Sequence, residues 1–135
     1  MSITIYATQV DFGESVMEDK LPQKTIKPWG FELLFAHTAK YAGKVIFVKK
    51  RHRLSLQYHK NKDETIYIHK GKASIEIDDE KGYLASRTLL PGQSIRIVPC
   101  TRHRLEALED TLLLEVSTAE LGDVVRLQDD YGRVT

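Results

Sequence analysis

The sequence is poor in several features that define whole classes of proteins. Cys100 is the single cysteine among 135 residues, so no disulfide can form within the chain and a reducing cytoplasm is the expected compartment. Neither charge dominates, because 20 Lys and Arg residues face 19 Asp and Glu residues, whereas a nucleic-acid binder normally shows a basic excess. No apolar run approaches the roughly 20 residues of a membrane-spanning helix, and acidic residues interrupt the N-terminal stretch before it could serve as a signal peptide. We therefore expect one domain, with neither a nucleic acid nor a membrane as its partner.

Long stretches of helical periodicity are also missing, and only residues 119–127 could form a short helix. Short runs rich in Ile, Val, Leu, Thr and Tyr lie instead between closely spaced turn residues. In one of them, Ile75 and Ile77 alternate with Ser74 and Glu76, which is the pattern of a half-buried strand. Strands are predicted at residues 31–36, 44–48, 54–59, 65–70, 73–77, 94–98 and 111–116. Many short strands at regular spacing predict an all-β sandwich or barrel.

Four side chains with metal-binding donors follow one another along the chain. On a strand, residues two apart share a face, so Gln57 and His59 point into the same space. Residues 60–63 are predicted to form a hairpin loop, which would bring Glu64, at the start of the returning strand, close to His59. His103 follows another alternating strand and a turn, and is the fourth candidate. Two imidazoles, a carboxylate and an amide suit one divalent Zn, Mn, Fe, Co or Ni ion, and the residues do not distinguish among these metals.

The order of these residues resembles the two motifs of the cupin superfamily. The shared pattern is Gln57-x-His59-x4-Glu64-x6-Gly71, followed by Pro91-Gly92 and His103. Cupins usually have histidine in the first position. The Gln57-x-His59 motif, preceded by Leu54-Ser55-Leu56, resembles that of the type II phosphomannose isomerase cupin. This cupin is commonly the C-terminal half of bifunctional mannose-1-phosphate guanylyltransferase/mannose-6-phosphate isomerase enzymes. The likeness runs from about Lys27 to Arg133 and includes Lys27-Pro28-Trp29-Gly30, Leu90-Pro91-Gly92-Gln93-Ser94, His103-Arg104-Leu105 and residues 124–133.

The resemblance implies a single-domain cupin, which is an all-β double-stranded β-helix also called a jelly-roll barrel. It assigns residues 27–135 to the barrel with a C-terminal tail, and residues 1–26 to an N-terminal arm that adds a strand. It also implies that the four donors described above hold the metal, and that two copies pair through their sheets as a homodimer. The implied activity is a metal-dependent interconversion of mannose 6-phosphate and fructose 6-phosphate, or of a related sugar phosphate.

Such an isomerase needs a base that moves a proton between C2 and C1, charge that stabilises the enediolate, and cations for the phosphate. The candidate cations, in decreasing order, are Lys44, Arg104, Arg126 and Arg133, and the first two are also candidate catalytic residues. If Lys44, Ile46 and Val48 face inward, the Lys44 ammonium needs a partner and serves as a proton-transfer group, a substrate anchor or part of a structural ion pair. The dense basic run at residues 49–53 is expected to be a solvated loop, with a cationic rim of the pocket as the alternative.

Three departures from the family pattern leave other functions open. Residues 60–65 replace a histidine-rich turn followed by Arg-Ala-Glu-His, residues 100–101 replace a glycine-containing turn, and residues 115–117 replace Glu-Val-Gln. Without Gln57, the predicted ligands are two histidines and one carboxylate, the set that non-haem iron oxygenases use. A non-catalytic, metal-stabilised module that binds a sugar without turnover is the third alternative.

Overall fold

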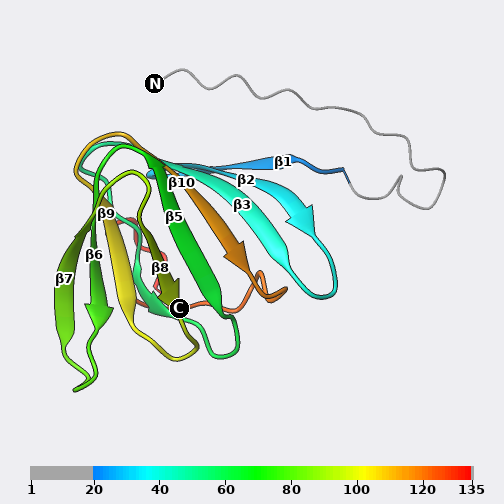
Figure 1. The fold of residues 1–135 in the computed structure, drawn as a ribbon. Helices are drawn as coiled ribbons and strands as arrows, with labels where there is room; N and C mark the ends of the chain where they lie inside the picture. Colours follow the sequence, from blue (N-terminus) through cyan, green and yellow to red (C-terminus); the bar gives the residue numbers. More distant parts are fainter. Residues whose placement is uncertain (1–19, 135) are drawn as a thin grey trace.

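The computed structural model describes residues 20–134 as two antiparallel sheets that pack face to face (Figure 1). The six-stranded sheet has the order β1-β2-β3-β10-β5-β8, and the five-stranded sheet has the order β11-β4-β9-β6-β7. The strands are β1 (Gln23–Lys27), β2 (Gly30–His37), β3 (Ala42–Val48), β4 (Leu56–Tyr58), β5 (Glu64–Lys70), β6 (Ala73–Asp78), β7 (Leu84–Leu89), β8 (Ser94–Ile97), β9 (His103–Ala107), β10 (Thr111–Ser117) and β11 (Val125–Gln128). The all-β prediction is confirmed. No helix in the described residues has the length and apolarity needed to span a bilayer.

Alternation of apolar and polar residues gives each sheet one face in a shared core. Ile46 of β3, Ile75 of β6 and Leu113 of β10 are 3%, 0% and 1% exposed, and they belong to one apolar cluster between the sheets. Further along β10 the inward residues become polar, since Glu115 and Ser117 are buried as well. The interior therefore has an apolar end and a polar end.

The N-terminal edge of the six-stranded sheet is formed by β1, which pairs with β2 along its whole length. All of this strand except Lys27 belongs to the predicted arm of residues 1–26. The first 19 residues of that arm lie outside the part of the chain that the structure describes.

The short helix that the sequence allowed at residues 119–127 does not form. Residues 119–124 form turns and loop, and β11 begins at Val125. An isolated helix this short is marginal in water, because few hydrogen bonds offset the cost of its first turn. Pairing with β4, in which Arg126 lies opposite Gln57, supplies backbone hydrogen bonds to this segment instead.

The predicted hairpin at residues 60–63 is also wrong. β4 pairs with β9 and β11 in the five-stranded sheet, whereas β5 pairs with β8 and β10 in the six-stranded sheet. Residues 60–63 therefore cross from one sheet to the other. We call this segment the crossing loop. Asp123 holds it, because its carboxylate accepts the backbone N–H groups of residues 60, 61 and 62 at 3.0, 2.7 and 2.9 Å.

The basic run at residues 49–53 lies at the opposite end of the six-stranded sheet from Glu64. Val48, which ends β3, pairs with Thr111 at the start of β10, whereas Glu64 pairs with Ser117 at the end of β10. The first three residues of the run are exposed. This location agrees with the expected loop, and it places the run away from the polar end of the interior.

Candidate metal centre

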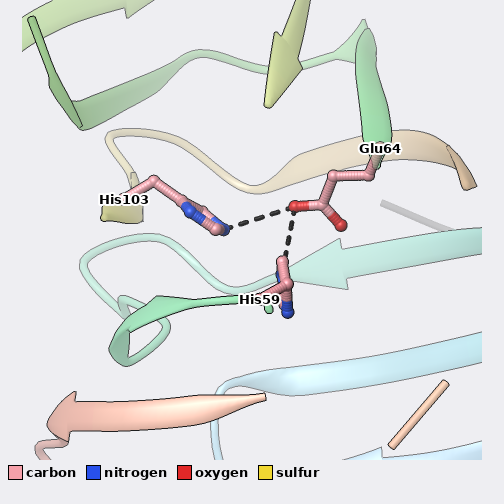
Figure 2. Close-up of side chains that lie close together, drawn as sticks. All are labelled: His59, Glu64 and His103. Atoms are coloured by element: carbon pink, nitrogen blue, oxygen red, sulfur yellow. Dashed lines mark ion pairs between the residues drawn. The ribbon is translucent and has the colours of Figure 1, made fainter. Parts of the chain in front are cut away.

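Two histidines and a glutamate meet at the polar end of the interior (Figure 2). His59 follows β4 and His103 begins β9, so both come from the five-stranded sheet, while Glu64 begins β5 in the other sheet. The Nε2 atoms of His59 and His103 lie 3.4 and 3.3 Å from Oε1 of Glu64. The three residues are 5%, 3% and 2% exposed in the order His59, His103, Glu64. The site therefore joins the two sheets and is shielded from water.

Backbone carbonyl groups orient both imidazoles. Nδ1 of His59 contacts the carbonyl oxygen of Asp123, and Nδ1 of His103 lies 2.9 Å from the carbonyl oxygen of Thr101. A neutral ring that donates from Nδ1 has its lone pair on Nε2, which is the arrangement found in metal-ligating histidines. Both Nε2 atoms are buried without a hydrogen-bond partner. Their lone pairs are therefore free for a cation.

The spacing of the three atoms fits a shared metal ion. Metal bonds of about 2.1 Å place neighbouring ligand atoms about 3.0 Å apart at right angles and about 3.4 Å apart at the tetrahedral angle. The Nε2–Oε1 separations of 3.3 and 3.4 Å fall in this range, and the three ligand atoms all lie within 4.8 Å of one another. Acceptor atoms that face each other without a donor repel one another, and a cation between them removes this repulsion. The residues thus fit a divalent metal.

Gln57, the predicted fourth ligand, lies beside the triad on the same face of the sheet. Its Cα is the register partner of His103, and residues directly opposite each other on antiparallel strands project to the same side. The side-chain oxygen of Gln57 accepts a hydrogen bond of 2.9 Å from the hydroxyl of Ser55. Coordination by Gln57 stays a prediction.

A buried ammonium that the sequence analysis missed lies next to the triad. Lys62 of the crossing loop is 5% exposed, and its Nζ lies 2.9 Å from Oε2 of Glu64 and 3.3 Å from Oε2 of Glu115. Lysines in polar loops are usually solvated, and the pattern of residues 60–63 predicts only a turn at Lys62. One signal was available in the sequence. The family pattern Arg-Ala-Glu has a cation two residues before the glutamate, and Lys62 holds that position before Glu64.

The environment of this cluster shifts the pKa values of its two carboxyl groups, Glu64 and Glu115, in opposite directions. Burial alone would raise the pKa of Glu64, but the adjacent His103 and His59 imidazoles and the charge of Lys62 lower it below its usual value. Burial and repulsion by Glu64 raise the pKa of Glu115 to about 7, despite the opposing effect of Lys62. Burial would lower the pKa of Lys62, yet Glu115 and Glu64 together raise it. The two carboxyl groups therefore compete for one ammonium, and Glu64 holds its negative charge more strongly.

Two of the four predicted cations lie on the interior side. Lys44 is on the inward face of β3 opposite Glu115, and its Nζ forms an ion pair of 3.2 Å with Glu32. Arg126 is the register partner of Gln57 and so faces the same side, and its Nε is buried without a hydrogen-bond partner. Arg126 thus offers an unused donor in the interior.

The structure does not bring the other two predicted cations to the triad. Arg104 follows His103 on β9 and projects to the opposite face, where its Nε donates to the carbonyl oxygen of Leu54 and its Nη2 contacts Asp130 at 3.3 Å. Arg133 forms a two-pronged ion pair with Asp129 in the C-terminal tail. Arg104 thus pairs with a tail residue and Arg133 pairs within the tail, so neither guanidinium group lies at the triad.

Asp123 is expected to control both the crossing loop and the triad. The backbone N–H groups of Asn61, Lys60 and Lys62 lower the pKa of its carboxyl group, and its carbonyl oxygen orients His59. Replacing Asp123 with alanine leaves these N–H groups without their carboxylate acceptor. We expect a lower urea midpoint and weaker metal binding for Asp123→Ala. Glu120→Ala, at an exposed residue in the same connection between β10 and β11, is the control. Equal urea midpoints for the two variants would contradict this role.

The two-sheet fold and the interior His–Glu–His triad together define the chain as a cupin, and the predicted cupin fold is confirmed. The chain belongs to the family described as Mannose-6-phosphate isomerase C-terminal, which matches residues 14–133. A buried triad of this composition is typical of cupin metal sites. No curated protein matches the sequence.

Solved structures with low sequence identity share the fold. KdgF from Halomonas sp. is 21% identical, with a TM-score of 0.64 over 72% of this chain and 86% of KdgF. Oxalate decarboxylase from Bacillus subtilis at pH 4.6 is 17% identical, with a TM-score of 0.69 over 79% of this chain and 30% of the enzyme. A Lactobacillus farciminis oxalate decarboxylase in a formate complex is 14% identical, with a TM-score of 0.67 over 78% of this chain and 33% of that protein. The chain thus spans about a third of the length of the oxalate decarboxylases.

Proposed function

We propose that the chain is a metal-dependent sugar-phosphate isomerase, which interconverts mannose 6-phosphate and fructose 6-phosphate or acts on a related sugar phosphate. The proposal rests mainly on one observation, the buried His59–Glu64–His103 triad in a chain of the Mannose-6-phosphate isomerase C-terminal family. A divalent metal bound there supplies positive charge that polarises the sugar oxygens and stabilises an enediolate.

The residues around the triad suit an anionic substrate. Lys44 carries an ammonium that is ion-paired with Glu32. Such an ammonium donates to an oxygen of the sugar or of its phosphate, but it has no free lone pair with which to take a proton. The substrate-anchor role is therefore favoured over the proton-transfer role. Arg126 supplies a second cation on the interior side, and its unpartnered Nε can donate to a phosphate oxygen.

The test is a coupled assay that measures fructose 6-phosphate formed from mannose 6-phosphate. The chelated protein is reloaded with Mn²⁺, Fe²⁺, Co²⁺, Ni²⁺ or Zn²⁺ before the assay. Mn²⁺ belongs in this series because a Bacillus subtilis oxalate decarboxylase of the same fold has Mn(II) centres. We expect turnover that His59→Ala abolishes. Arg126→Gln should raise KM for the phosphorylated sugar more than it lowers kcat. Sugar-phosphate binding without turnover for every metal would favour the non-catalytic module instead.

Oxygenase chemistry is the second candidate, and the composition of the triad favours it. Two histidines and one carboxylate leave coordination positions open when bound to Fe²⁺. In this structure the side-chain oxygen of Gln57 accepts a hydrogen bond from Ser55, and if it keeps that bond the triad retains a further open coordination position. Oxygen consumption by the Fe²⁺-loaded protein with small organic substrates, together with no isomerase activity, would favour this function. The homodimer and the cytoplasmic location stay predictions.

A further inference from the structure

The two oxygens of Glu64 have different neighbours. Oε1 faces the Nε2 atoms of both imidazoles at 3.4 and 3.3 Å, whereas Oε2 lies 2.9 Å from Nζ of Lys62. Oε2 is buried, and it makes no regular hydrogen bond in the described residues, so the contact with Lys62 is an ion pair. One oxygen is thus directed to the metal position and the other to an ammonium.

Lys62 is held in place at both of its ends. Its backbone N–H donates to Asp123 at 2.9 Å, within the set of bonds that fixes the crossing loop. Its Nζ donates to Oε2 of Glu115 at 3.3 Å. Glu115 projects from the middle of β10, which is paired on both sides, so its position is set by the six-stranded sheet. The ammonium therefore has little freedom to move away from Glu64.

We propose that Lys62, held by Glu115, is a positioning residue that makes Glu64 a one-oxygen ligand and thereby sets the metal affinity of the site. The ammonium attracts Oε2 and keeps Oε1 as the oxygen that faces the imidazoles. Without Lys62, the carboxylate is free to rotate and to offer both oxygens to a metal, and Glu115 loses its cation. This inference rests on the proposed metal centre.

A purely structural role for Lys62 predicts a different result. If the ion pairs only stabilised the fold, a folded Lys62 variant would bind metal as the wild type does. Partners of metal ligands typically change metal affinity about 10–100-fold when they are replaced. The dissociation constant for a metal and the spectrum of the bound metal therefore separate the two roles.

The experiment is a Co²⁺ titration of chelator-treated full-length protein, followed by the visible absorption of bound Co²⁺, which depends on coordination number. We expect Lys62→Met to change the Co²⁺ dissociation constant about 10–100-fold from the wild-type value, with an altered spectrum. Lys62→Arg, which keeps the charge, should restore most of the wild-type affinity. Lys60→Met, at an exposed lysine of the same loop, should match the wild type in both measurements.

Wild-type affinity and an unchanged spectrum in folded Lys62→Met would overturn the inference. If Lys62→Met does not fold, Glu115→Gln replaces it in the same titration. A changed dissociation constant with an altered spectrum is then expected, and an unchanged affinity and spectrum would overturn the inference. A wild-type protein that binds no Co²⁺ would instead contradict the metal centre itself, so the two failures are distinguishable.

Discussion

Exchange of His103 for alanine is expected to abolish stoichiometric metal binding and, with it, the stability that the metal gives to the fold. The ligands come from both sheets, so the unfolded chain lacks the assembled site and the metal binds the native state alone. A ligand that binds only the native state stabilises it by about 4 kcal/mol when its free concentration is 1,000 times its Kd. Elemental analysis and urea unfolding, each with and without metal, measure the two effects.

His69→Ala is the matched control, because His69 is exposed on β5 and is not part of the triad. It should keep both the metal and the stabilisation. Acidification of the wild-type protein should release the metal, since protons compete with it for the two Nε2 atoms. Full metal content in His103→Ala, or equal unfolding curves for the chelated and metal-loaded wild type, would contradict the site.

Spacing and the family resemblance were sufficient to select the interior triad, but not to explain how it is assembled. Gln57, His59, Glu64 and His103 were all predicted at one position, and the last three do meet there. The path of the chain between them differs from the prediction, because the turn residues at 60–63 indicate a change of direction but not which sheet the next strand joins. That pairing depends on contacts distant in sequence, such as those between Asp123 and the crossing loop.

Strand alternation could have placed one predicted site residue away from the triad and could not have found a buried residue beside it. Neighbouring residues on a strand face opposite sides, so once His103 faces the interior, Arg104 must project to the other face of the sheet. Alternation does not predict the burial of Lys62, because this burial depends on two carboxylates from β5 and β10. A charge becomes buried where partners from other strands surround it, and single-strand patterns do not record those partners.

Replacing Lys62 with methionine is expected to lower the free energy of unfolding of the chelated protein by about 3–5 kcal/mol, the usual effect of removing one partner of a buried ion pair. The variant leaves Glu64 and Glu115 buried close together without the ammonium between them. The double variant Lys62→Met/Glu115→Gln removes one of the two negative charges, so it should recover part of the loss. Urea unfolding of the single and double variants measures the coupling. If the change in the free energy of unfolding of the double variant equals the sum of the changes in the two single variants, the coupling between Lys62 and Glu115 is contradicted.

The pH dependence of the chelated protein provides a separate test of Glu115. Its pKa is raised from 4.5 to about 7 in the fold, so between these values the native state binds its proton more tightly than the unfolded chain does. Stability follows the difference in bound protons, so this group makes the free energy of unfolding fall as the pH rises through that window. Glu115→Gln cannot titrate and should show a flatter profile from about pH 5 to about pH 8, with its largest gain over wild type at the upper end. Glu64 is present in both proteins, so it does not distinguish their profiles. Its lowered pKa makes the free energy of unfolding rise with pH, but only below this window. Parallel profiles would mean that Glu115 is already ionised at the lower pH, and that Lys62 compensates both carboxylates at once.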